Sequence, residues 1–71
     1  MDKETAEKIK RRGETAIREL TSILVLDQIE RECSPDEYEA GRRAIGLAIG
    51  IIDTELLSIV YRQFPELDPI D

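Results

Sequence analysis

One short segment of the chain, Ser34-Pro35-Asp36-Glu37, separates two long stretches of helical pattern and sets the architecture. Serine is a favoured helix N-cap, proline suits the first helical position, and a glutamate three residues after the serine completes a capping box. No other proline occurs before Pro65. The sequence therefore predicts a first helix, a turn over residues 33–35, and a second helix that begins at Pro35.

Both stretches have the spacing of amphipathic helices, with small or apolar residues three or four positions apart. In the first stretch these residues are Ala6, Ile9, Gly13, Ala16, Ile17, Leu20, Ile23 and Leu24. The first helix is expected over about 3–32, with Asp2 as its cap. The second is expected over about 35–63, because Pro65 disfavours helix at the residue before it. Residues 65–71 form an acidic tail with two prolines after a helical domain of residues 1–64.

A connection of a few residues forces two long helices to lie antiparallel. The expected fold class is therefore all-α, an antiparallel two-helix hairpin. A chain of 71 residues buries a modest core. Cys33 is its only cysteine and histidine is absent, so an internal disulfide is excluded and metal ligands are few. Association with another chain is the remaining way to stabilise so small a core. We therefore expect the hairpin to dimerise into a four-helix bundle.

The second helix has more apolar surface than the first helix can cover. At 100° steps, one stripe is expected to pack against the first helix, and it contains Ile45, Ile49, Ile52, Leu56 and Ile59. The predicted interface with a second copy lies outside this stripe and consists of Gly46, Leu47, Gly50, Ile51 and Leu57. Each of its large side chains would gain roughly 1.5–3 kcal/mol from burial.

Gly46 and Gly50 are four residues apart and so lie on one ridge, where small residues allow another helix to approach closely. The alternatives are relief of crowding inside the hairpin, a kink, or close approach of a ligand. Asp27 falls at the centre of the apolar stripe of the first helix. A carboxylate there requires a cation, so we expect a structural ion pair with Arg42 or Arg43, which the hairpin brings alongside. The alternatives are a functional carboxylate and simple exposure to solvent.

The residues give little support for catalysis. Without histidine, Ser-His and Cys-His nucleophiles are excluded. Cys33 has acids around it and is interpreted as an incidental turn residue, and Asp53 and Glu55 lack the Glu-x-x-His motif of bundle metal sites. The glycines follow no phosphate-loop pattern. We therefore expect a protein that is not an enzyme and that holds no cofactor or metal.

Lys8, Lys10, Arg11 and Arg12 form the best basic patch, which suggests a nucleic-acid regulator as the alternative function. Pairing of these bases with acids of the hairpin or the dimer is the competing explanation. The net charge of −6 makes nucleic acid an unfavourable partner. The leading hypothesis is a protein-protein interaction module, an adaptor, small chaperone or inhibitor that acts as a homodimer.

The first residues are charged and do not lead into an apolar run, so no secretory signal is expected. The longest uncharged stretch is Ala44 to Ile52, nine residues. A helix that spans a membrane needs about 20. A lone cysteine without an export signal suggests a reducing cytosol. The expected location is the cytoplasm, with no membrane partner.

Overall fold

The computed structural model describes residues 1–69, so the last two residues of the predicted tail, Ile70 and Asp71, lie outside the described part. Helix α1 spans Lys3–Ile23. It begins as expected, because the Thr5 N–H donates to Asp2 Oδ1 at 2.8 Å. This hydrogen bond is the main reason that the pKa of Asp2 is lowered. The predicted N-cap is therefore confirmed.

The first predicted helix does not continue to residue 32. It ends at Ile23, residues 24–26 form a turn, and a separate short helix, α2, covers Asp27–Glu32. Two hydroxyls near the break, those of Thr21 and Ser22, donate to backbone carbonyls of their own helix. Such hydrogen bonds and nearby β-branched residues slightly lower helix propensity, so they favour an early end of the helix.

The capping box is confirmed in full at the start of helix α3, Pro35–Ile51. The Glu37 N–H donates to Ser34 Oγ at 3.1 Å, and the Ser34 N–H donates to Glu37 Oε1 at 2.7 Å. The second hydrogen bond lowers the pKa of Glu37. This pair fixes where the returning helix begins.

The helix continues beyond α3 through a wider turn, the π-helix η1 at Ile52–Leu56, into α4 at Leu57–Gln63. The three segments form one continuous helical stretch, Pro35–Gln63. Within the wide turn the Thr54 hydroxyl donates to the Gly50 carbonyl at 2.7 Å. A π-helical turn holds more residues than an α-helical turn, so it rotates the following segment relative to the preceding one.

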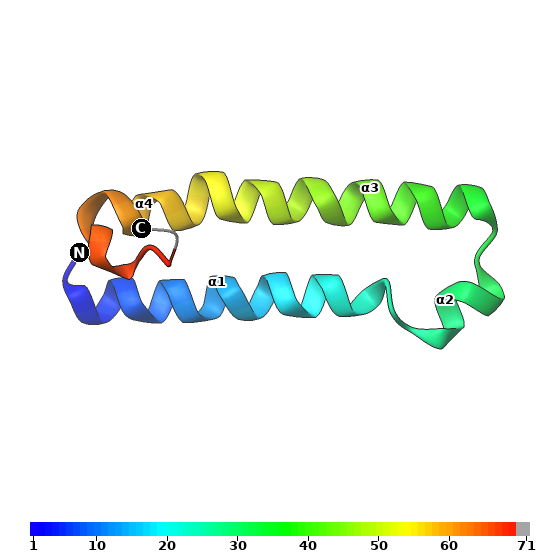
Figure 1. Ribbon diagram of the computed structural model, residues 1–71, viewed down its shortest axis with the longest axis horizontal. Coiled ribbons are helices and arrows are strands. Elements are labelled where there is room, and N and C mark those ends of the chain that lie inside the picture. The colour runs from blue at the N-terminus through cyan, green and yellow to red at the C-terminus, as the bar shows by residue number, and fades with distance from the viewer. Residues whose placement is uncertain (70–71) are drawn as a thin grey trace.

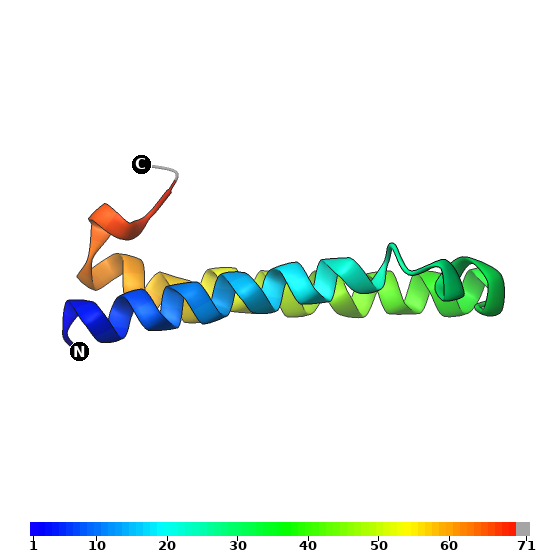
Figure 2. The ribbon, with the colours of Figure 1, turned by 90° about the horizontal axis from the view of Figure 1, so that it is seen from below.

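Figures 1 and 2 show a thin molecule in which α1 runs beside α3 and α4 in the opposite direction. We call the end with α2 and the start of α3 the turn end. The end with the start of α1 and with α4 is the open end. The molecule measures 45 × 20 × 17 Å, and its radius of gyration is 15.0 Å. A compact domain of this length would have a radius of about 11 Å. The described chain is all-helical, as the sequence predicts.

The fully buried side chains lie at the open end. Ala6, Leu57 and Val60 are at most 2% exposed, and Gly13 is buried with them. A Cβ built on Gly13 would lie 2.8 Å from Leu57 Cδ2. The glycine therefore leaves room for the Leu57 side chain against α1, and this contact belongs to the small core between α1 and α4.

After α4 the chain turns back over one face of the open end (Figure 2). A short 3₁₀ helix, η2, covers Pro65–Leu67, and Phe64 and Leu67 are half-buried. The Lys3 ammonium lies 3.5 Å from a Glu66 carboxylate oxygen. This segment adds a third layer at the open end.

Candidate interaction surface

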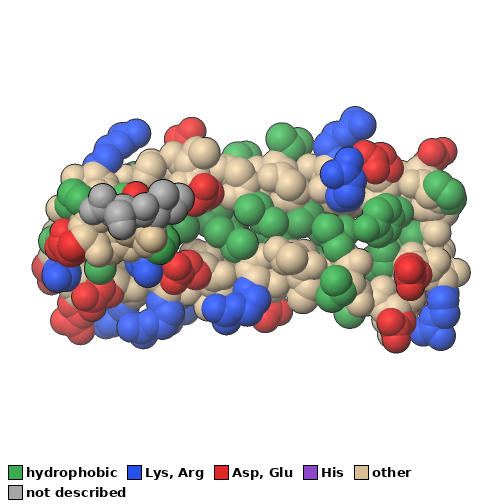
Figure 3. All heavy atoms as spheres, viewed as in Figure 1, with side chains coloured by type: hydrophobic (Ala, Val, Ile, Leu, Met, Phe, Trp, Pro, Cys, Tyr) green, Lys and Arg blue, Asp and Glu red, His purple; other side chains and the backbone are tan. Residues whose placement is uncertain are grey.

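The described surface carries nine large hydrophobic side chains that are more than a third exposed. Four lie toward the turn end, two near the middle of α3 and three toward the open end: Ile23, Val25, Leu26 and Tyr38; Leu47 and Ile51; Met1, Leu56 and Ile59. Figure 3 also shows hydrophobic side chains at the surface along the seam between α1 and α3. Apolar surface therefore extends along the whole molecule.

The total exposed area of the chain is larger than that of a compact monomer. The chain exposes 5467 Å². A compact folded monomer of 8.1 kDa would expose about 4500 Å². The excess, on the order of 1000 Å², is similar to the roughly 800 Å² that each partner buries in a stable protein interface.

The middle of α3 presents four of the five residues predicted as an interface. Leu47 is 64% exposed and Ile51 is 60% exposed. Cβ atoms built on Gly46 and Gly50 would have no neighbouring atom within 4 Å apart from their own helix. The glycines therefore do not relieve crowding inside this chain. They leave the helix surface shallow beside Leu47 and Ile51.

The fifth predicted interface residue, Leu57, is not at the surface, since it is 2% exposed and packs against Gly13. The prediction was wrong because a uniform 100° step does not allow for the π-helical turn. Beyond Ile52 that turn shifts the inward stripe by one residue. Leu57 and Val60 face α1 in place of the predicted Leu56 and Ile59, which are 41% and 46% exposed. The sequence carries no simple signal of this shift.

A hollow at the turn end is lined mainly by apolar residues that sequence reasoning did not group together. Its lining includes Leu24, Val25, Leu26, Ile29, Cys33 and Tyr38. The hollow exists because α1 stops at Ile23, so the residues after it turn away from the helix axis. A continuous helix would have placed these side chains elsewhere. Val25, at 77% exposure, is the most exposed of the large hydrophobics.

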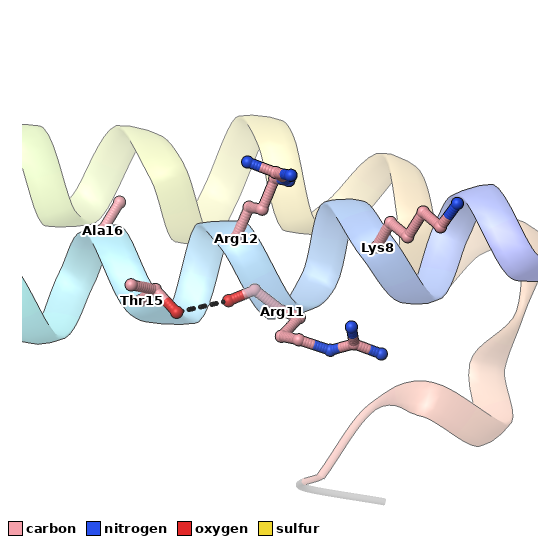
Figure 4. Close-up of a pocket in the computed structure, with 5 residues that line it drawn as sticks. All are labelled: Lys8, Arg11, Arg12, Thr15 and Ala16. Carbon is pink, nitrogen blue, oxygen red and sulfur yellow. Dashed lines mark hydrogen bonds between the residues drawn. The ribbon is translucent and has the colours of Figure 1, made fainter.

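Three bases of the predicted basic patch, Lys8, Arg11 and Arg12, line a shallow pocket on the first half of α1 with Thr15 and Ala16. Lys10 is not at this pocket and lines another with Glu7, Glu14 and Leu67. Figure 4 shows that the Arg11 and Arg12 side chains extend in different directions from the helix. Lys8 is 3.5 Å from Glu4, and Lys10 is 3.5 Å from Glu14. The four bases therefore do not converge on one point, and two of them have acidic partners within α1.

The predicted ion pair of Asp27 with Arg42 or Arg43 is absent from the described chain. Arg42 binds Glu39 instead, with Nη2 at 2.6 Å from Oε1 and Nε at 3.1 Å from Oε2. This hydrogen-bonded pair raises the pKa of Arg42 and lowers that of Glu39. Asp27 is exposed at the start of α2, since the break after Ile23 removes it from the stripe where a cation was required.

Within residues 1–69 no group of three or more metal-ligating side chains comes together. The most perturbed aromatic group is Tyr61, whose pKa is raised by partial burial and then by Glu14, Asp68 and Asp53. A raised pKa keeps this phenol protonated. None of these groups forms an arrangement of nucleophile, base and orienting partner.

The chain matches no protein-family model, no curated protein and no solved structure. One helical stretch in the described chain, Pro35–Gln63, passes a test of length and composition for crossing a membrane. Core helices of soluble proteins, which are mostly buried, have the same length and composition, but only 17% of the most apolar part of this stretch is buried. The stretch contains Asp53 and Glu55, and charged residues are costly at the centre of a bilayer.

Proposed function

We propose that this protein is a non-enzymatic interaction module whose hairpin pairs with a second copy to form a four-helix bundle. It would serve as an adaptor, a small chaperone or an inhibitor that covers a partner. The observation that carries this proposal is the set of nine exposed large hydrophobic side chains in a chain with few fully buried ones. An apolar surface of this extent is typical of a protein-binding site.

A second copy suits the surface better than a small ligand. The apolar side chains extend over a molecule 45 Å long, and another copy has the same length. The excess area is also close to that buried by each partner of a stable interface. Two-fold dimers are the commonest soluble oligomers, and a two-helix layer that doubles gives the four-helix bundle.

Leu47 and Ile51 are the side chains that the proposal places nearest the centre of the interface. Both are at least 60% exposed, so each has much apolar area to bury. Full burial of one such side chain stabilises by roughly 1.5–3 kcal/mol. Replacing both with glutamate is expected to leave two charges facing an apolar partner and to dissociate the dimer.

The test is a dilution series of the full chain, with mass measured by light scattering and helicity by circular dichroism. The wild-type protein should be a dimer whose helicity falls as it dissociates. L47E/I51E should be monomeric and less helical. The matched control is Q28E/Q63E, which adds the same charge at two exposed glutamines and should remain dimeric. A wild-type chain that stays monomeric and fully helical would disprove the proposal.

The alternative is a small nucleic-acid-binding regulator that uses Lys8, Lys10, Arg11 and Arg12. Its supporting observation is that Arg11 and Arg12 form no ion pair within residues 1–69. Binding to a duplex should then weaken steeply with salt. Reversing Arg11 and Arg12 to glutamate should abolish it. Absence of binding at low salt would eliminate this alternative.

A further inference from the structure

The net negative charge of the molecule is concentrated at the turn end. Residues 19–43, which form that end, contain seven acids and three bases, a net charge of −4. Residues 1–18 and 53–69, which form the open end, contain eight acids and seven bases, a net charge of −1. The open end also carries the basic patch on α1. The two ends therefore differ in charge although they are built from the same pair of antiparallel segments.

This difference distinguishes the two ways in which two copies could align. The molecule is 45 Å long, and the Debye length at physiological ionic strength is about 8 Å, so charges at opposite ends do not interact. In a parallel pair the two turn ends would lie side by side with a combined charge of −8. In an antiparallel pair each turn end would lie beside an open end, with a combined charge of −5. The antiparallel pair avoids about half of the repulsion between facing ends.

The exposed apolar residues are compatible with that alignment over its full length. Leu47 and Ile51 lie at the middle of the helical stretch Pro35–Gln63, so a two-fold axis near residue 49 brings them beside their counterparts. The same axis places the exposed turn-end residues of one copy against the open end of the other. Those residues include Val25 and Leu26 on one side and Met1 and Ile59 on the other.

We infer that the two copies of the proposed dimer pack antiparallel, each acidic turn end beside the partner's open end. This inference rests on the proposed homodimer and assigns a role to the basic patch. Arg11 and Arg12 have no acidic partner in their own described chain. In the dimer this half of α1 lies alongside the partner's turn end, which carries Glu30 and Glu32 on α2.

The direct test is a spin-label distance measurement on two single-cysteine variants of the full chain, C33S/Q28C and C33S/Q63C. Gln28 is exposed at the turn end and Gln63 is exposed at the open end. In an antiparallel dimer each variant alone should give a distance above roughly 30 Å, because a 29-residue helix is about 43 Å long. A mixture of the two variants should add a distance below roughly 25 Å between unlike subunits.

The opposite result overturns the inference: short distances in each variant alone and a long one in the mixture show a parallel dimer. That outcome would leave the homodimer itself intact. A single spin per particle, with the monomer mass by light scattering, would overturn the homodimer and the inference together. The mass and the distance are measured on the same samples, so the two failures are distinguished.

A charge exchange gives a second readout. R11E/R12E should raise the dimer dissociation constant about tenfold or more, the scale of four exposed ion pairs, because the two-fold axis repeats the contact. Adding E30K/E32K should restore most of the affinity, because the pairs are then re-formed with reversed sign. E30K/E32K alone, by contrast, should not strengthen a dimer in which these acids face the partner's arginines. If R11E/R12E and E30K/E32K change the dissociation constant additively, and the combined variant shows no rescue, the antiparallel contact is contradicted.

Discussion

The open end and the turn end of this molecule are built from the same two antiparallel helical segments, yet only the open end excludes water. Ala6, Leu57 and Val60 are buried there, and no side chain of residues 19–43 is fully buried. Two features are present at the open end and missing from the turn end. Gly13 leaves room for the Leu57 side chain against α1, and the chain after Phe64 covers one face of the pair. Two helices alone leave their seam exposed, and a third layer is what completes a core.

The largest expected change in stability comes from one of two single-residue deletions, each at a threonine. Thr54 lies in the wide turn η1 and Thr15 lies in regular helix, and both hydroxyls donate to the backbone carbonyl four residues earlier. Deleting Thr54 allows a regular α-helix that still points Leu57 and Val60 inward, so stability should change by less than about 1 kcal/mol.

Deleting Thr15 instead rotates one half of α1 by about 100° relative to the other. Ala6 and Gly13 can then no longer face α4 while Ile17 and Leu20 face α3. We expect the protein to lose more than about 3 kcal/mol, or to fail to fold, in denaturant titrations. Equal effects of the two deletions would mean that η1 does not set the register.

The second prediction compares adjacent leucines across the same turn. Leu57→Ala should destabilise the fold by about 2–5 kcal/mol, because this side chain is buried against Gly13. Leu56→Ala should have a smaller effect, about 1 kcal/mol or less, since 41% of this residue is exposed. Urea unfolding of both variants at one protein concentration measures the difference. A larger loss for Leu56 would support the uniform helical register.

The third prediction concerns the glycines at the middle of α3. In this chain nothing lies near Cβ atoms built on Gly46 and Gly50, so G46A/G50A should raise helix stability by about 1 kcal/mol per site when the protein is dilute. If these glycines contact the second copy, the same variant should weaken the dimer. Gly41→Ala is the control, because its site is also open and lies outside the proposed contact. It should raise helicity without changing the dimer mass.

The smallest expected effect is at the capping box. Ser34→Ala should cost about 1 kcal/mol by removing the cap of α3. The pKa of Glu37 is lowered because its carboxylate accepts from the Ser34 N–H. The stabilisation is therefore present above the ordinary glutamate pKa and is lost as pH falls through the lowered value. An NMR titration of Glu37 should find a pKa below that of a free glutamate. A normal pKa would show that the capping box does not form in solution.

The parts of this structure that could be predicted are those determined by near neighbours in sequence. Asp2 and the pair of Ser34 and Glu37 act within one helical turn, and their caps follow from residue type and spacing. The pairing of Arg42 with Glu39 is also local, and its three-residue spacing could have revealed it. The sequence analysis instead predicted that Arg42 or Arg43 pairs with Asp27 across the hairpin.

The failures arose where small local preferences add up along a helix. The break after Ile23 depends on several weak propensities, none decisive alone, and it displaced Asp27 from the seam. Because of the turn at η1, Leu57 faces inward and Ile59 outward, the reverse of what a regular helix with 100° steps predicts. A single extra residue in a turn changes every face beyond it, and hydrophobic periodicity does not locate such a residue.

The position of the small core has a consequence for how the chain folds. The contact between Gly13 and Leu57 joins residues 44 positions apart, so the core forms only when a long loop closes. On the ribosome, α1 would emerge well before its partner segment, as an isolated helix of 21 residues that is marginally stable in water. We therefore expect the newly made helix to lack its packing partner, and to be available to a chaperone, until α4 has been made.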